Sequence, residues 1–438
     1  MRQALRGSRS WLGAALLAIM LPSVAAAAGA LPRFFVIPDS DGTTITMVSQ
    51  PGSFDNPFFQ NLGTNGRRCV TCHAPAEGWT ITPGGVQRLF KATNGLAPLF
   101  RTNDGSTSPT ADVSTVDARR AAYGLLLSKG LIRVGRPVPR GAEFTLVTAD
   151  DPYGFASAAE LSLFRRPLPS TNLTFLSTVM WDGRETLPGQ SIHADLLDQA
   201  SGATVGHAQG TPPSPATLER IVGFESSLFT ARSRDGVTGF LDVAGARGGP
   251  AALSRQLFYL GINSTVDPRG IPPTTRVFTI FDAWASAVGR SGAVRQSVAR
   301  GQEIFNNRPF GGRATCSGCH NAPNAGSSST ATLFNLGISD EARRTPDLPL
   351  YTFRCTRGPL RGTTIRSTDP GLALTTGRCS DIGKFKVPTL RGLASRAPYL
   401  HDGSAATIEA VVDFYDTRFG MGLTNVDKDD LVAFLRSI

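Results

Sequence analysis

Apolar residues recur every three or four positions in several segments of this chain, which is the period of an α-helix. The segments with this pattern are residues 115–130, 214–229, 278–288, 294–305 and 427–438. In the second of them, Ser214 followed by Pro215 is typical of a helix start, because serine caps free backbone N–H groups and proline has none to leave unsatisfied. The run Pro57–Leu62 predicts a further short helix. The pattern therefore predicts helices in both halves of the chain.

Other segments lack the helical period. Residues 43–48 and 144–147 have the composition of short strands, and the polar stretch 102–115 predicts a loop. Forty-seven glycines and thirty prolines favour long ordered loops. The pattern of residues 278–305 breaks near Gly289, so we predict a boundary there between domains of residues 31–290 and 291–438.

Composition limits the function classes that fit. A length of 438 residues allows two domains, and 41% hydrophobic with 18% charged residues is typical of a folded globular protein. The net charge of +10 comes from arginines scattered along the chain, without a dense basic tract. We therefore expect no nucleic-acid partner, and an acidic redox partner is consistent with the charge.

The first thirty residues predict a secretory signal peptide. Arg2, Arg6 and Arg9 precede an apolar run over residues 12–24, and small residues follow at 26–30. Cleavage is expected near residues 28–30, which predicts export to the periplasm; an uncleaved anchor is the alternative. No later segment is apolar for long enough to span a bilayer, so no membrane span is expected after cleavage.

Two copies of one motif carry the candidate chemistry. Cys69-Val-Thr-Cys72-His73 and Cys316-Ser-Gly-Cys319-His320 have the Cys-x-x-Cys-His spacing that attaches c-type haem. The two thiols form thioethers and the histidine reaches the iron from one side. A zinc site is the alternative, but the repetition of the complete motif favours two covalently bound haems.

Two cysteines, Cys355 and Cys379, are left outside the motifs. An even pair in an exported chain predicts a disulfide, with free thiols as the alternative.

Three further segments, with the haem motifs, make the chain resemble the bacterial di-haem cytochrome c peroxidase family, which includes the MauG enzymes. The segments are Met180–Arg184 with Gln190 soon after, Lys386–Arg391 and Ala397–Gly403. The resemblance runs from about residue 55 to the C-terminus. It implies a mainly α fold of two cytochrome c-like domains, each with one haem, with long loops and a few short strands.

The resemblance also implies an activity. Electrons from a small cytochrome c or copper protein would enter at the C-terminal haem and pass through Trp181 to the N-terminal haem, where hydrogen peroxide is reduced to water. One alternative is a MauG-like enzyme that forms high-valent iron and oxidises a protein or organic substrate. Another is an electron carrier without enzymatic activity. Many relatives dimerise, so a homodimer is also considered.

The iron ligands are expected to differ between the two haems. His73 and His320 are the near-side ligands. Some relatives carry a capping histidine soon after the first motif, but none occurs here before His193, so we predict an open first haem. For the second haem, the family's spacing from the motif around His401 falls on Tyr415, and Met421 is the alternative far-side ligand.

The group that moves protons during peroxide cleavage departs from the family pattern. Gln190 matches the family's glutamine, but its glutamate is missing, and His207 is the predicted replacement; His207 could equally be a structural histidine. Two segments are predicted insertions, residues 95–160 and 355–379. Some relatives bind calcium, and Asn172 is near the corresponding position, which makes Ca²⁺ a further predicted cofactor.

Overall fold

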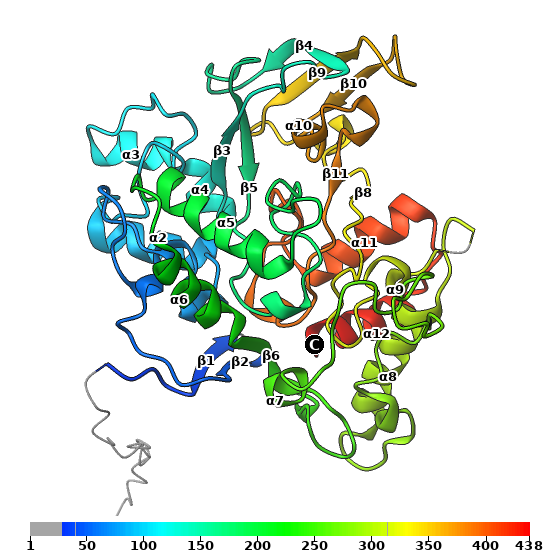
Figure 1. The fold of residues 1–438 in the computed structure, drawn as a ribbon. Helices are drawn as coiled ribbons and strands as arrows, with labels where there is room; N and C mark the ends of the chain where they lie inside the picture. The colour runs from blue at the N-terminus through cyan, green and yellow to red at the C-terminus, as the bar shows by residue number, and fades with distance from the viewer. Residues whose placement is uncertain (1–28, 40, 313) are drawn as a thin grey trace, which may run out of the picture.

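The computed structural model describes residues 29–39, 41–312 and 314–438. These residues form twelve α-helices, seven short 3-10 helices and eleven strands (Figure 1). Helices are the larger elements, and the strands are more numerous than the few that were expected. Residues 1–28 of the predicted signal peptide lie outside the described residues. Within the described part of the chain, every helix is too short or too polar to cross a bilayer.

The α-helices are α1 (Cys69–Cys72), α2 (Pro83–Thr93), α3 (Val116–Ala122), α4 (Gly124–Lys129), α5 (Ile192–Gly206), α6 (Pro215–Ser226), α7 (Gly249–Leu253), α8 (Gly292–Asn307), α9 (Cys316–Cys319), α10 (Ala373–Thr376), α11 (Ile408–Phe419) and α12 (Asn425–Arg436). The 3-10 helices are η1 (Pro57–Phe59), η2 (Pro75–Glu77), η3 (Leu173–Phe175), η4 (Asp282–Ser286), η5 (Glu341–Arg343), η6 (Cys379–Asp381) and η7 (Leu393–Ser395). The strands are β1 (Phe34–Asp39), β2 (Gly42–Val48), β3 (Ile132–Arg136), β4 (Phe144–Asp150), β5 (Leu161–Arg165), β6 (Leu228–Asp235), β7 (Gly239–Phe240), β8 (Phe334–Asn335), β9 (Leu350–Cys355), β10 (Thr364–Ser367) and β11 (Lys384–Phe385).

The strands form four small antiparallel sheets. The largest has the order β1-β2-β6-β7, and the buried hydroxyls of Thr46 and Thr230 are 2.7 Å apart within it. The predicted strand at residues 43–48 is confirmed as β2, whereas β1 was not predicted. The pair β3-β5 ends at Arg165, and the chain then runs through Arg166–Pro169 into the centre of the molecule.

The two predicted insertions come together in one sheet. Strand β4 of the first insertion pairs with β9, and β9 pairs with β10 of the second, in the group at the top of Figure 1. Cys355 at the end of β9 forms the predicted disulfide with Cys379. Phe144, Tyr351 and Phe353 form a buried core beneath these strands. Segments from both sides of residue 290 thus share one sheet and one core.

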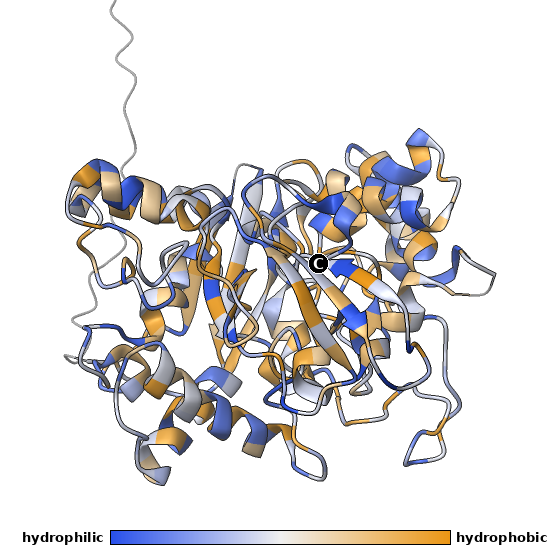
Figure 2. Ribbon diagram, turned by 90° about the horizontal axis from the view of Figure 1, so that it is seen from above, coloured by the Kyte–Doolittle hydropathy of each residue, from blue (hydrophilic) through white to orange (hydrophobic). Residues whose placement is uncertain are grey.

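Separate hydrophobic cores support the two haem motifs. Near the first motif, Trp79, Phe58 and Phe224 pack together with Leu196 of α5. Near the second motif, the core includes Phe434 and other residues of α8, α11 and α12. Helices α8 and α12 approach so closely that a Cβ at Gly301 would lie 1.9 Å from a backbone oxygen of α12. Hydrophobic and hydrophilic residues alternate along the helices, as expected for elements with one buried side (Figure 2).

The predicted helix at residues 278–288 is wrong except for the short η4. Here, side chains of α8 satisfy the backbone groups that a helix would pair internally. The Phe278 N–H donates to Asn306 Oδ1 at 3.0 Å, and the Phe281 N–H donates to Gln302 Oε1 at 2.9 Å. The apolar residues of this segment, including Trp284, are buried against α8 in the same core. Their spacing therefore reflects tertiary packing.

Most of the other predicted helices are confirmed. However, the segment predicted at Pro57–Leu62 forms only the 3-10 helix η1, and residues 228 and 229 of the segment predicted at 214–229 belong to strand β6. Residues 115–130 form α3 and α4, interrupted at Tyr123, and residues 294–305 lie within α8. Helix α6 begins as predicted, since the Ser214 side chain accepts from the Thr217 N–H and Pro215 occupies the first turn. The C-terminal segment forms α12. Of these helices, α6, α8 and α12 carry residues that line the cavities described next.

Candidate functional site

The two Cys-x-x-Cys-His segments have the same local structure. Each cysteine pair lies on a one-turn helix, α1 or α9, and the histidine ends it. The His73 N–H donates to the Cys69 carbonyl at 3.0 Å, and the His320 N–H donates to the Cys316 carbonyl at 2.9 Å. None of the four cysteines forms a disulfide. Two thiols and one imidazole are therefore held together in each segment.

A backbone carbonyl orients each imidazole. His73 Nδ1 lies 3.1 Å from the Trp79 carbonyl oxygen, and His320 Nδ1 lies 2.5 Å from the Gly326 oxygen. A carbonyl only accepts, so Nδ1 carries the proton and Nε2 keeps a free lone pair. Burial lowers the pKa of both histidines to about 4, so both are neutral at pH 7. Neutral imidazole with a free Nε2 is the form that ligates a metal.

A cavity of about 180 Å³ opens beside the first motif, and a second of about 440 Å³ opens beside the other. We call them cavity 1 and cavity 2. Cavity 1 is lined by Cys69, Cys72 and His73, and cavity 2 by Cys316, Cys319 and His320. Most of the remaining lining is apolar in both. Each motif therefore has its own largely hydrophobic space.

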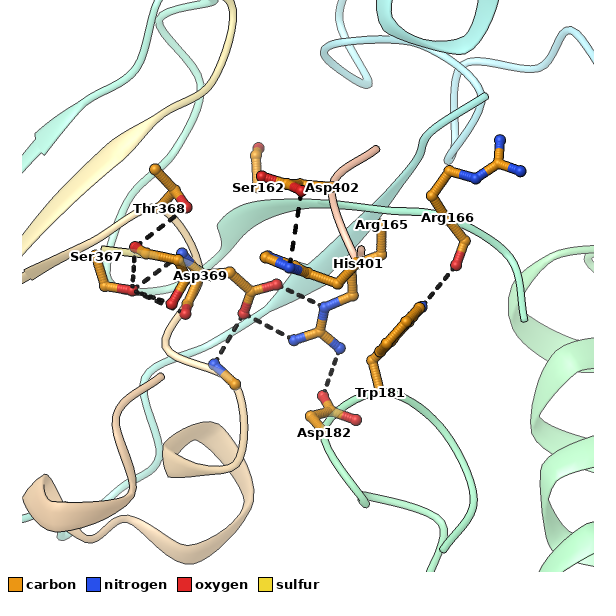
Figure 3. Close-up of polar contacts among 12 residues, drawn as sticks. Ser162, Arg165, Arg166, Trp181, Asp182, Ser367, Thr368, Asp369, His401 and Asp402 are labelled. Carbon is orange, nitrogen blue, oxygen red and sulfur yellow. Dashed lines mark hydrogen bonds and ion pairs between the residues drawn. The ribbon is translucent and has the colours of Figure 1, made fainter. Parts of the chain in front are cut away.

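Trp181 lies in the wall that the two cavities share. The residues that line both cavities come from two segments and the tryptophan: Arg166, Pro167, Leu168, Pro169, Trp181, Lys386, Pro388 and Thr389. Trp181 Nε1 donates to the Arg166 carbonyl at 2.8 Å (Figure 3). The next residue, Asp182, bonds Arg165 at 2.7 Å and thereby fixes the turn that carries the indole. Hydrogen bonds thus hold the predicted relay residue in the wall between the cavities.

His207 lines cavity 1 at the C-terminal end of α5. Its Nδ1 lies 2.5 Å from Asp104 Oδ2, and Asp104 Oδ1 pairs with Arg67. Burial alone would raise the pKa of Asp104, but the hydrogen bond to His207 and the charge of Arg67 outweigh it and lower that pKa. Asp104 is therefore a carboxylate that holds the His207 ring. It belongs to the predicted loop 102–115, which is buried over residues 104–108.

The structure does not bring Gln190 to either cavity; its side chain is exposed. Gln199, two turns into α5, lines cavity 1 instead. Glu225 of α6 also lines cavity 1, and it forms no hydrogen bond or ion pair through its side chain with any residue that the structure describes. Burial raises its pKa to about 8. A carboxyl group thus lines cavity 1. It belongs to a residue that lies later in the sequence than the segment after Gln190, where the family pattern places its glutamate.

Asp104, Gln199 and Glu225 were missed by sequence reasoning. Asp104 carried no signal, because it is 103 residues from His207. Glu225 had a weak signal as the one acidic residue among the apolar positions near the end of α6. Gln199 shares a helix face with Leu196 and Ala203, so the period of α5 could have indicated its direction.

Both candidate far-side ligands line cavity 2. Tyr415 lies on α11, and Met421 follows the end of that helix. The Tyr415 hydroxyl makes no hydrogen bond with a described residue, and burial raises the pKa of Tyr415. Met421 is buried in the core around α8 and α12. The geometry leaves both residues as candidates.

Both polar atoms of the Asn172 side chain form hydrogen bonds with the backbone of the main sheet. Its Nδ2 donates to the Thr230 carbonyl and its Oδ1 accepts from the Thr230 N–H, both at 2.9 Å. Across residues 29–39, 41–312 and 314–438, no group of three or more His, Cys, Asp or Glu side chains is arranged to hold a metal ion. Calcium binding stays a prediction.

The residues around each motif fit a c-type haem. Each cavity offers two unpaired thiols for thioether bonds, one neutral imidazole with Nε2 free, and an apolar lining. A tetrahedral zinc site fits poorly, because it needs four protein ligands, and among the described residues no group of even three His, Cys, Asp or Glu side chains is arranged to hold a metal ion. The side chains and the cavity at each motif would therefore suit a c-type haem.

Comparison with known proteins supports this class. The chain is 32% identical over 174 residues to the cytochrome-c peroxidase IdrP1 of Denitromonas iodatirespirans, covering 36% of this chain and 44% of that protein. It is 25% identical over 300 residues to the methylamine utilization protein MauG of Methylophilus methylotrophus, covering 64% and 70%. The chain thus spans less than half the length of the peroxidase relative. No family model matches the sequence.

A solved structure described as a MauG-like protein associated with microbial copper homeostasis is 18% identical, covering 64% of this chain and 75% of that one, with a TM-score of 0.34. The relatives matched in sequence are cytochrome c peroxidases and MauG proteins. The chain is a relative of these proteins, and the family resemblance predicted from its motifs is confirmed.

Proposed function

We propose that this protein is an exported, periplasmic di-haem peroxidase that reduces hydrogen peroxide to water with electrons from a small redox protein. The observation that carries the proposal is the pairing of two Cys-x-x-Cys-His cavities across one wall that contains Trp181. The names of the relatives, cytochrome-c peroxidase among them, agree with it. A c-type haem bound at each motif supplies the redox chemistry.

The two cavities suit different tasks. Cavity 2 is lined by His320 and by Tyr415 and Met421, and one of these two could serve as a further ligand if a haem is bound there, which would suit a haem that only transfers electrons. Cavity 1 offers ionisable groups near its motif, His207 and Glu225. Peroxide reduction is therefore assigned to cavity 1. Electrons enter at cavity 2, and the indole of Trp181 lies in the wall that they cross.

Reduction of one peroxide to two water molecules consumes two electrons and two protons. The electrons come from the donor protein, and residues of cavity 1 move the protons. His207, held by Asp104 through Nδ1, has its other ring nitrogen available to accept and return a proton. Glu225, with a pKa raised to about 8 by burial, is protonated at pH 7 and can deliver one. The apolar remainder of the cavity excludes bulk water from these transfers.

A turnover assay tests the proposal. The purified protein should contain two haems per chain and oxidise two reduced donor molecules, such as a small cytochrome c, for each peroxide consumed. A variant with Cys69→Ser and Cys72→Ser should keep one haem and lose turnover. Two haems without peroxide-dependent oxidation of any small cytochrome or copper protein would contradict the proposed activity.

A second function is favoured by Tyr415. A tyrosine ligand in cavity 2 would lower the potential of that haem relative to methionine, which suits oxidation of a protein or organic substrate. The match to MauG covers 70% of that protein. If Tyr415 proves to be the ligand and small donor proteins are not oxidised, this function replaces the peroxidase.

A further inference from the structure

Four buried arginines, Arg67, Arg133, Arg165 and Arg232, are neutralised by carboxylates. Arg165 lies between Asp369 and Asp182, with N–O distances of 2.7 Å to each (Figure 3). Arg67 is paired with Asp104, and the fully buried Arg232 has acidic partners on β1 and β6 and in the turn after β1. This is the expected arrangement, because an unpaired buried charge costs several kcal/mol.

Three buried cations that line the cavities lack such partners among the described residues, as does Arg391, which lines neither cavity. Arg166, Lys386 and Arg396 are buried, with at most 9% of each residue exposed. None forms an ion pair with a residue that the structure describes. Lys386 Nζ donates to the Thr178 carbonyl at 2.6 Å, and Arg166 donates to the Arg396 carbonyl at 3.1 Å. Their polar contacts are backbone carbonyls, which accept hydrogen bonds but carry no charge to balance the cations.

Burial makes these charges costly. Burial lowers the pKa of Lys386 to about 7, and burial together with the charge of Arg396 lowers that of Arg166 to about 10. The polypeptide therefore gathers positive charge in a place that disfavours it. An anion from outside the polypeptide would remove this penalty.

The position of the cations indicates which kind of anion would bind to them. Arg166 and Lys386 line both cavities, and Arg396 lines cavity 2. An anion reaching them must lie in the space beside the haem motifs. On the proposed function, each cavity holds a haem, and a haem carries two propionate carboxylates. We propose that Arg166, Lys386 and Arg396 bind haem propionates, with Arg166 and Lys386 serving both haems and Arg396 serving the second.

The proposal predicts a pattern of reduction potentials. Loss of a cation that binds a propionate favours the more positive ferric haem, so the potential becomes more negative. Lys386→Met should shift both potentials, and Arg396→Met should shift only that of the second haem. Lys386→Gln is the milder variant should methionine impair folding. Lys384→Met is the matched control, because Lys384 is on the same segment, pairs with Asp381 and lines neither cavity.

Resonance Raman spectra provide a readout of contact, since propionate bending bands respond to hydrogen bonding at the carboxylates. These bands should change in the Lys386 and Arg396 variants and stay as in the wild type in Lys384→Met. Unchanged potentials and bands in protein that carries two haems would overturn the proposal while leaving the peroxidase intact. A wild-type protein without haem would contradict the proposed function and this inference together.

Discussion

Asp104→Asn tests the proposed role of Asp104 and His207 in moving protons in cavity 1. The carboxylate accepts hydrogen bonds at both oxygens, from His207 Nδ1 at 2.5 Å and from Arg67. Asparagine has nearly the same shape, but its NH₂ end cannot accept. One of the two contacts is therefore lost, and His207 is no longer held by a charged partner in a fixed tautomer.

The size of the effect follows from the contact that is lost. A hydrogen bond to a charged group contributes about 1.5–3 kcal/mol. At about 1.4 kcal/mol for each factor of ten, this corresponds to a loss of roughly 10- to 150-fold in kcat/KM for peroxide. His207→Ala removes the group itself and should cost about 100- to 10,000-fold. Both variants should keep two haems.

The assay is the rate of peroxide reaction with the ferric protein in a stopped-flow instrument, with the haem content measured in parallel. Glu160→Gln is the control, because it removes the carboxylate partner of another buried arginine, Arg133, and lines neither cavity. It should react like the wild type. If Asp104→Asn reacts at the wild-type rate, or if Glu160→Gln slows equally, the proposed role of the Asp104–His207 pair is refuted.

Three further results are expected. The wild-type peroxide rate should fall as the pH rises through about 8, where Glu225 loses its proton, and Glu225→Gln should lack this fall; a fall that persists in the variant would point to another group. Trp181→Phe should slow reduction of the first haem by the second, measured by flash photolysis, with haem content unchanged; an unaltered rate would exclude the indole. Of Tyr415→Phe and Met421→Leu, only the variant of the true ligand should change the second haem's absorption spectrum, and no change in either would exclude both.

Local patterns were sufficient to predict the haem motifs and most helices. Cys69–His73 and Cys316–His320 are read directly from spacing, because attachment needs both thiols and the imidazole on one turn. Helix α12 follows from its apolar face. The prediction of a helix at residues 278–288 was wrong, because the apolar residues of this segment pack against α8 and side chains of α8 bind its backbone.

Contacts between distant segments could not be predicted. Strand β4 pairs with β9, which lies about two hundred residues later in the sequence. The local sequence of neither strand indicates its pairing partner. The same holds for the residues of cavity 1. Asp104 and Glu225 reach it through the packing of a loop and of α6, whereas Gln190, chosen by its distance from Trp181, is exposed. Distance along a motif is a poor guide where the chain has insertions.

The most direct test of the proposed function is the electron paramagnetic resonance spectrum of the ferric protein before and after addition of hydrogen peroxide. One haem, at His73, should give a high-spin signal that peroxide abolishes, and the other, at His320, should give a low-spin signal. The high-spin signal should disappear from the variant with Cys69→Ser and Cys72→Ser. Two low-spin haems that do not react with peroxide in any redox state would contradict the assignment of cavity 1 as a peroxide site.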